Sequence, residues 1–230
     1  MSDTNDTVLL ETAGAVATVT LNRPDALNAL DEAMIGALHD AMIRLEHDES
    51  VRCVVLRGAG DSFMAGGDIR VFARALETLE PAARQAKFEG MIGQVHASVV
   101  AIRRMEKPVI AAVHGAAAGF GLSLALAADL ALATDDTVFT LAYCHIGTSP
   151  DGGSTFHLPR AVGMKRAMEI ALLGDRFGAE QAAAIGLINR VVPAADLAGE
   201  TERLAARLAQ GPTAAYGRTK RLLNGSFDAC

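Results

Sequence analysis

The stretch that decides the fold is Val113-His114-Gly115-Ala116-Ala117-Ala118-Gly119-Phe120-Gly121-Leu122-Ser123, near the middle of the 230-residue chain. An apolar strand over residues 109–113 ends in it, and its small residues lead into an apolar helix. A helix that begins there directs its first free amides, and the positive end of its dipole, beyond the strand edge. Small residues also suit tight helix packing, so this stretch by itself leaves a structural role open.

A glycine loop that comes earlier in the chain has the same local order, and we call it the first glycine loop and the stretch of residues 113–123 the second glycine loop. Phe63-Met64-Ala65-Gly66-Gly67-Asp68-Ile69-Arg70 follows a strand and precedes a helical pattern. Two successive glycines let the backbone approach a ligand, and their amides could face an anion. Glycine pairs are also common in ordinary strand-to-helix turns, so a purely structural turn is the alternative.

Strand, glycine-containing loop and helix recur outward from these two loops, which predicts an α/β fold with a mostly parallel, buried sheet. The first two strands form a hairpin, residues 73–80 form a polar, mobile segment, and Asp31 caps the first helix. Near Pro193 an α/β core, residues 1–193, gives way to a helical C-terminal region, residues 194–230. The predicted strands are 8–11, 16–21, 51–56, 109–113 and 130–133, and the predicted helices are 28–46, 81–105, 161–173, 178–184, 194–210 and 212–223.

The composition excludes several classes of protein. Half of the residues are hydrophobic and 21% are charged, which excludes intrinsic disorder. The net charge of −6, from 21 Lys and Arg against 27 Asp and Glu, argues against nucleic acid as a partner. Apolar runs are too short for a membrane span, and the polar N-terminus is unlike a secretory signal, so we expect a cytoplasmic protein. The three cysteines lack the spacing of a disulfide framework or a zinc site.

Four ordered motifs together resemble the crotonase superfamily, also called the enoyl-CoA hydratase/isomerase family. They are Leu21-Asn22-Arg23-Pro24-Asp25-Ala26-Leu27-Asn28-Ala29-Leu30, residues 65–68, residues 114–121 and residues 147–154. The resemblance implies a spiral of ββα units, a helical C-terminal region that mediates trimerisation, and homotrimers or dimers of trimers. Family members usually have further helices that complete the acyl pocket, so we expect either a truncated chain or a site closed by a neighbouring subunit.

The resemblance also implies an acyl-CoA thioester substrate, in which coenzyme A is part of the substrate and no separate cofactor is expected. No HExxH motif is readable in the sequence, and no metal is required. The carbonyl oxygen of the thioester would lie between the amides of Gly67 and Phe120, which would stabilise negative charge on that oxygen. By position, the remaining substrate-binding residues would be Ala26, Ala65, Gly66, Asp68, Ile69, Ser123 and Tyr143.

The family's hydratases use two glutamates to activate water and deliver a proton, and those positions are occupied here by Ser123 and Tyr143. Tyrosine, with an ordinary pKa near 10, is a poor base at neutral pH. Serine is no base without a partner that takes its proton. The two-glutamate route to hydration is therefore disfavoured.

A carboxylate occurs downstream, at Asp151 in Ser149-Pro150-Asp151-Gly152-Gly153-Ser154. The structural alternative is a turn whose aspartate caps the helix that begins near Ser154. This motif resembles the branch of the family that includes ring-opening isomerases, in which a carboxylate at this position is the single base. One base suffices for isomerisation because it removes a proton from one carbon and returns it to another. We therefore predict that Asp151 is the catalytic base, with a pKa raised by an apolar pocket.

Among the histidines, His145 is the alternative base, because it lies two residues beyond Tyr143. His114 is assigned a structural hydrogen bond, and His96 is assigned no role. Three functions stay open: an enoyl-CoA isomerase, a hydratase or dehalogenase-like hydrolase, and a catalytically silent CoA-binding protein. The absence of tryptophan weighs against the dehalogenase resemblance.

Overall fold

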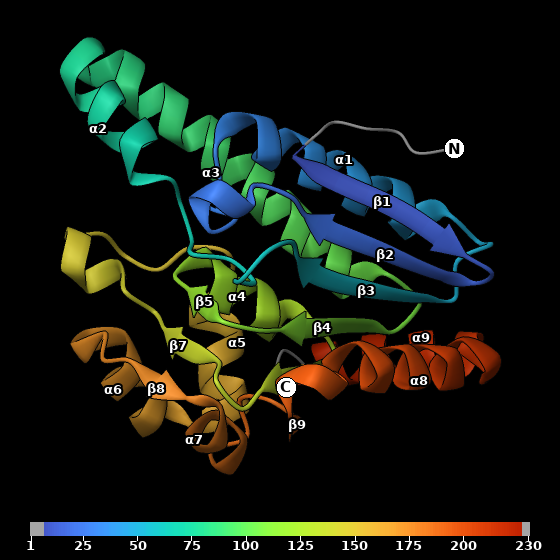
Figure 1. Cartoon of the computed structure of the whole chain (residues 1–230). Coiled ribbons are helices and arrows are strands. Elements are labelled where there is room, and N and C mark those ends of the chain that lie inside the picture. The colour runs from blue at the N-terminus through green and yellow to red at the C-terminus, as the bar shows by residue number, and fades with distance from the viewer. Residues whose placement is uncertain (1–6, 227–230) are drawn as a thin grey trace.

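The computed structural model describes residues 7–226, in which the main sheet has six strands (Figure 1). Its strand order is β1-β2-β3-β4-β6-β9, with β1 antiparallel to β2 and all other neighbours parallel. The predicted hairpin and the mostly parallel sheet are confirmed. The bounds are β1 Val8–Ala13, β2 Val16–Leu21, β3 Cys53–Gly58, β4 Val109–Val113, β6 Leu130–Thr134 and β9 Arg190–Val192.

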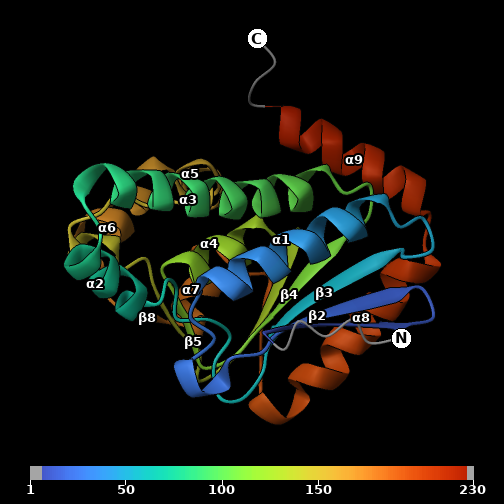
Figure 2. The same ribbon diagram turned by 90° about the horizontal axis from the view of Figure 1, so that it is seen from above.

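Both faces of this sheet are covered by helices (Figure 2). Helix α1 (Glu32–His47) and helix α3 (Pro81–Arg104) lie on one face, and helix α8 (Leu197–Gln210) lies on the other. The central strand β4 is buried along its whole length. Its alternate residues Ile110 and Ala112 join the cluster beneath α8, because successive side chains of a strand point to opposite faces.

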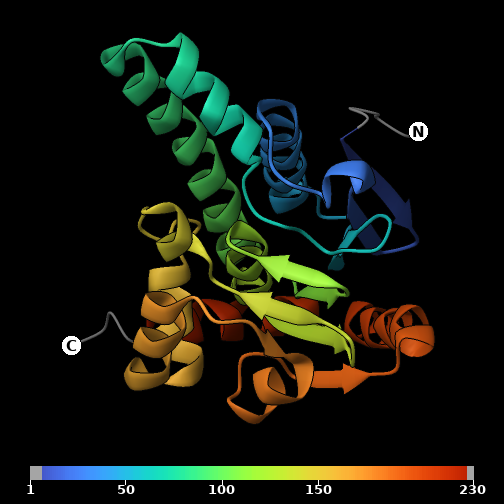
Figure 3. The same cartoon turned by 60° about the vertical axis from the view of Figure 1, so that its left-hand side comes forward.

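A smaller sheet stands beside the ends of the main strands (Figure 3). It contains β5 (Ala116–Ala118), β7 (Val138–Thr140) and β8 (Phe177–Gly178). The chain thus passes from a main-sheet strand to a small-sheet strand and then to a helix, as in β4, β5 and α4 (Phe120–Ala127). The chain also reaches the small sheet after β3, where Met64 forms an isolated parallel bridge with Ala117 of β5. This repetition is the expected spiral of ββα units.

Two expectations for the helices are wrong. Most of residues 73–80 do not lie outside the helices but belong to helix α2 (Ile69–Thr78), which Asp68 caps by accepting a hydrogen bond from the Arg70 amide. Residues 161–173 are not one helix, because Gly163, with a φ of 78°, separates two helices. The remaining elements are η1 Pro24–Ala26, η2 Tyr143–Ile146, α5 Ser154–Val162, α6 Met164–Leu173, α7 Ala179–Ala184, η3 Ala194–Asp196 and α9 Thr213–Gly225.

The predicted helical region after Pro193 consists of η3, α8 and α9 over the described residues. Helix α8 packs on the main sheet through Ala205 and Ala209. Helix α9 is fixed by Lys220, whose ammonium lies 2.7 Å from the Asp129 carboxylate. The division of the chain at Pro193 stays a prediction. Among residues 7–226, no helix has both the length and the apolar character that crossing a membrane requires.

Candidate active site

The first glycine loop is held by Asn28 and Leu30. The buried Asn28 side chain donates hydrogen bonds to the carbonyls of Ala59 and Ser62, at 2.9 and 2.7 Å. The Leu30 amide donates to the Gly66 carbonyl at 2.7 Å, and the Asp68 amide donates to the Leu30 carbonyl at 2.9 Å. These two bonds flank Gly67, so the Gly67 amide points away from Leu30, as expected for parallel pairing.

The second glycine loop brings Phe120 against the first. Phe120 is the first residue of α4, so its amide has no acceptor within the helix. A Cβ built on Gly66, which has a φ of 88°, would lie 3.4 Å from the Phe120 nitrogen and 3.1 Å from the Ala118 oxygen. Within residues 7–226 the amides of Gly67 and Phe120 donate to no protein acceptor. The structure therefore brings together the two loops whose amides were predicted to share an oxyanion.

The Asp151 side chain is held by Tyr143 rather than used as a helix cap. The Tyr143 hydroxyl donates to Oδ1 of Asp151 at 2.5 Å. The Ser154 amide, at the start of α5, donates instead to the main-chain carbonyl of Asp151, at 3.1 Å. Asp151 is thus half-buried and available for chemistry, although the Pro-Asp-Gly-Gly turn also exists as its sequence suggests.

The surroundings of Asp151 shift two pKa values. Burial raises the pKa of Asp151, while the Tyr143 hydrogen bond and the charge of His96 partly oppose that rise. The pKa of Tyr143 is raised by burial and then by the neighbouring Asp151 charge and hydrogen bond. The phenol therefore stays protonated and acts as the donor. A carboxyl group with a raised pKa is better matched to proton transfer near neutral pH.

Ser123 and Phe120 of α4 both contact the turn that carries Asp151 and Gly152. The Ser123 hydroxyl lies 3.2 Å from the Asp151 carbonyl and 3.3 Å from the Gly119 carbonyl, and donates to one of them at a time. The Phe120 ring is buried against Gly152. The aromatic side chain therefore supports the Asp151 turn.

The other predicted binding residues surround the first glycine loop. Ala26 ends η1, the Ala65 amide donates to the Leu27 carbonyl at 2.9 Å, and Ile69 is exposed at the start of α2. The buried Asp68 carboxylate is already paired with Arg23 and Arg70, at 3.2 and 2.8 Å. Hydrogen bonds from Arg70 lower the pKa of Asp68 to about 2. The two arginines therefore neutralise the charge of Asp68, and their ion pairs with it order this loop.

The histidines divide differently from expectation. His114 makes a structural hydrogen bond to the Gly60 carbonyl at 2.9 Å. His145, the alternative base, bonds through Nε2 to the Gly174 carbonyl at 3.0 Å and forms no hydrogen bond with Asp151. His96 on α3, to which the sequence assigned no role, is the histidine whose charge acts on Asp151. The pattern that could have pointed to His96 is helical spacing. Val99 lies three residues later on the same side of α3 and packs beside Gly153, in the turn that carries Asp151.

Phe72 is a further residue that sequence reasoning missed. A Cβ built on Gly67 would lie 2.8 Å from Cζ of Phe72, so the ring covers Gly67. Phe72 also packs edge-on against Phe88 of α3, with 5.3 Å between ring centroids. These aromatic rings from α2 and α3 supply apolar surroundings beside the predicted oxyanion position.

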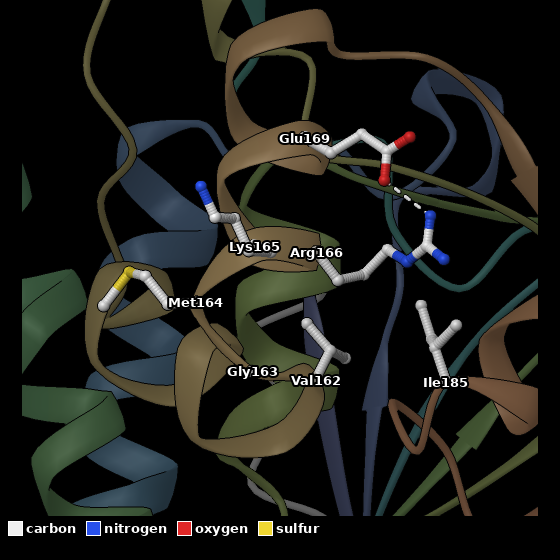
Figure 4. Close-up of a pocket in the computed structure, with 7 residues that line it drawn as sticks. All are labelled: Val162, Gly163, Met164, Lys165, Arg166, Glu169 and Ile185. Atoms are coloured by element: carbon white, nitrogen blue, oxygen red, sulfur yellow. Dashed lines mark hydrogen bonds and ion pairs between the residues drawn. The ribbon is translucent and has the colours of Figure 1, made fainter.

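A separate surface pocket lies where α5 meets α6 (Figure 4). Arg166 and Glu169 form an ion pair at its edge, with a separation of 2.5 Å. The pocket shares no residue with the predicted site, so it carries none of the chemistry argued above. It is lined by Val162, Gly163, Met164, Lys165, Arg166, Glu169 and Ile185.

Comparison with known proteins places this geometry in a family. Residues 11–229 match the model of the enoyl-CoA hydratase/isomerase family. The chain belongs to this family, the crotonase superfamily. Its fold is similar to the crystal structure of an enoyl-CoA hydratase from Mycobacterium avium subsp. paratuberculosis, with a TM-score of 0.85, 36% identity, and coverage of 96% of this chain and 82% of that one.

Relatives with three different names are similar to this chain. The probable enoyl-CoA hydratase of Rhodobacter capsulatus is 40% identical, with coverage of 96% of this chain and 82% of the relative. The 1,2-epoxyphenylacetyl-CoA isomerase of Escherichia coli is 36% identical, with coverage of 95% and 82%. The 4-chlorobenzoyl coenzyme A dehalogenase-2 of an Arthrobacter species is 37% identical, with coverage of 99% and 81%. These comparisons establish the family. Because the relatives are named as a hydratase, an isomerase and a dehalogenase, similarity alone does not identify the reaction that this chain catalyses.

Proposed function

We propose that this protein is an enoyl-CoA isomerase in which Asp151 moves a proton and the amides of Gly67 and Phe120 stabilise the enolate. The observation that carries the proposal is the half-buried Asp151 carboxylate, whose pKa is raised chiefly by burial. Within residues 7–226, the groups that act on this pKa are Tyr143, His96 and the amide of Asp151 itself, with no second carboxylate among them. A single base is what double-bond migration needs.

The reaction follows from these positions. The Asp151 carboxylate removes a proton from a carbon of the enoyl chain, and the electron pair spreads onto the thioester oxygen. The two free amides donate to that oxygen, a contribution typically worth about 3 kcal/mol per donor. The protonated Asp151 then returns the proton two carbons away, so the double bond migrates and the base is restored.

Binding of the substrate is part of the same proposal. The CoA portion would lie along Ala26, Ala65, Gly66 and Ile69, which surround the first glycine loop, and CoA would arrive as part of the substrate without a separate cofactor. Ser123 and Tyr143 would border the acyl group. We further propose the assembly typical of the family, a homotrimer or a dimer of trimers.

The test is a panel of 3-enoyl-CoA and 2-enoyl-CoA thioesters, with bond migration and water addition measured separately. Wild-type protein should isomerise the 3-enoyl thioesters, and Asp151→Asn should lose at least about a hundredfold in turnover. Asp175→Asn, which removes an exposed carboxylate, is the matched control and should remain active. Fast hydration of 2-enoyl-CoA without migration would overturn the reaction, and an active Asp151→Asn protein would overturn the base.

Hydrolytic dehalogenation is the second candidate, favoured by the interaction between His96 and Asp151. A carboxylate can displace halide from an activated ring carbon to form an ester. An imidazole can then deprotonate the water that hydrolyses this ester and restores the carboxylate. Chloride release from 4-chlorobenzoyl-CoA, lost in both His96→Gln and Asp151→Asn, would support this candidate, and no release by the wild type would exclude it.

A further inference from the structure

We propose that Tyr143 is a positioning residue for the reaction of Asp151: its hydroxyl holds Oδ1 of the carboxylate and leaves Oδ2 as the oxygen that takes the proton. This inference rests on the proposed function, because it gives Asp151 the role of the base. Tyr143 was predicted only to border the substrate.

The contact fixes which oxygen is free. Tyr143 donates to Oδ1 at 2.5 Å, and within residues 7–226 no group of another residue donates to Oδ2. A phenol that stays protonated can only donate to a carboxylate, so the direction of this bond is settled. The base therefore presents one defined oxygen to the substrate.

Both partners of this bond have a fixed backbone. Ala142, with a φ of 57°, turns the chain so that η2 begins at Tyr143, and the Tyr143 carbonyl accepts a hydrogen bond from the Thr148 amide at 3.2 Å. The Asp151 carbonyl accepts a hydrogen bond from the Ser154 hydroxyl at 2.9 Å. These hydrogen bonds restrain both main chains, so the contact with the Tyr143 hydroxyl sets the direction of the Asp151 side chain.

The same bond controls when Asp151 is ionised. Burial favours the neutral acid, whereas a hydrogen bond donated to the carboxylate favours the charged form, so the two effects oppose each other. The groups that act on the pKa of Asp151 are Tyr143 from η2 and His96 from α3, and α4 contributes the neutral Ser123 hydroxyl, which lies 3.2 Å from the Asp151 carbonyl. His157 of α5 lies beside Gly153, and burial lowers its pKa to about 4, so it is uncharged above that pH. Removing the Tyr143 hydroxyl therefore removes the largest of the effects that oppose the burial of Asp151.

The experiment is a direct titration of Asp151 in Tyr143→Phe. Protein labelled with carboxyl-13C aspartate is titrated by NMR, and the Asp151 signal is assigned by its loss in Asp151→Asn. We expect the pKa of Asp151 to rise by about one pH unit in Tyr143→Phe. With an active thioester, the acidic limb of kcat/KM should move upward equally, and the plateau should fall about tenfold because the carboxylate loses its fixed direction.

Two controls separate this role from a structural one. Tyr216→Phe removes the chain's other phenol, which has no hydrogen bond among the described residues, and should leave the Asp151 titration unchanged. Ser154→Ala removes a bond to the Asp151 carbonyl and should lower stability without moving the titration by more than a few tenths of a unit.

The outcomes also separate this inference from the proposed function. An unchanged Asp151 titration in folded Tyr143→Phe would overturn the role of Tyr143, whatever reaction the enzyme catalyses. If no enoyl-CoA is isomerised by the wild type, the proposed function fails, and the NMR titration still decides whether Tyr143 controls the Asp151 carboxylate.

Discussion

The Phe120 ring occupies the space that a side chain at Gly152 would require. A Cβ built on Gly152 would lie 2.5 Å from Cδ2 of Phe120, and the φ of Gly152 is 59°. The amide of Phe120 faces the predicted oxyanion position, and its side chain supports the turn that carries Asp151. One residue thus connects the two halves of the proposed reaction, and its ring helps to fix their relative position.

Gly152→Ala should therefore be strongly destabilising. The left-handed backbone costs about 1 kcal/mol for alanine, and the clash with a buried ring adds about 1–3 kcal/mol. Urea unfolding measures the sum. Gly147→Ala is the matched control, because Gly147 has a φ of 68° and a Cβ built on it would have nothing within 4 Å. Equal losses in the two variants would show that the Phe120 ring yields at no cost.

Gly66→Ala should damage activity more than stability. Its Cβ would press on Ala118 and Phe120 and so push the two glycine loops apart. A displacement of one oxyanion donor typically costs about a hundredfold or more in turnover. Isomerase turnover and urea unfolding should be measured together on Gly66→Ala and Gly14→Ala.

Gly14 has a φ of 58° in the β1–β2 turn, with open space around it, so Gly14→Ala reproduces the backbone strain without touching the loops. Both variants should lose about 1 kcal/mol from the left-handed backbone alone. Only Gly66→Ala should lose turnover. Similar turnover in the two variants would mean that the separation of the loops does not govern the reaction.

Local sequence was sufficient where backbone geometry decides the outcome. The small residues before Phe120 predicted the start of α4, and Asp31 predicted the cap of α1, because both effects act within a few residues. The first helix was nevertheless expected from residue 28, whereas α1 begins at Glu32. Asn28 is instead left-handed, with a φ of 55°, and its side chain is used to fix the glycine loop.

Local sequence was insufficient where long-range packing decides. Residues 73–80 look polar because most of α2 is exposed, and the contact that places this helix is Phe72 on Phe88. The bond from Tyr143 to Asp151 depends on a left-handed alanine, Ala142, which has no sequence signal. His96 lies 55 positions before Asp151, so their interaction requires the packing of α3 beside the turn.

His157 should make stability depend on pH. Burial, and then the charges of Arg103 and Arg160, lower its pKa from 6.5 to about 4. The unfolded chain therefore binds a proton between these pH values and the folded chain does not, so stability rises with pH across this window and is complete above it. From pH 5 to pH 7 this histidine should add about 2 kcal/mol to the free energy of unfolding.

His157→Gln removes the titrating group and keeps a polar side chain of similar size. Urea unfolding at pH 5, 6 and 7 should show that the stability of the wild type relative to this variant increases with pH by about 2 kcal/mol. His47→Gln, which removes an imidazole from the exposed side of α1, controls for the loss of a histidine as such. A constant difference between wild type and His157→Gln would mean that His157 is protonated equally in the folded and unfolded chains. The lowered pKa would then be wrong, and with it the neutral surroundings assigned to α5 beside Asp151.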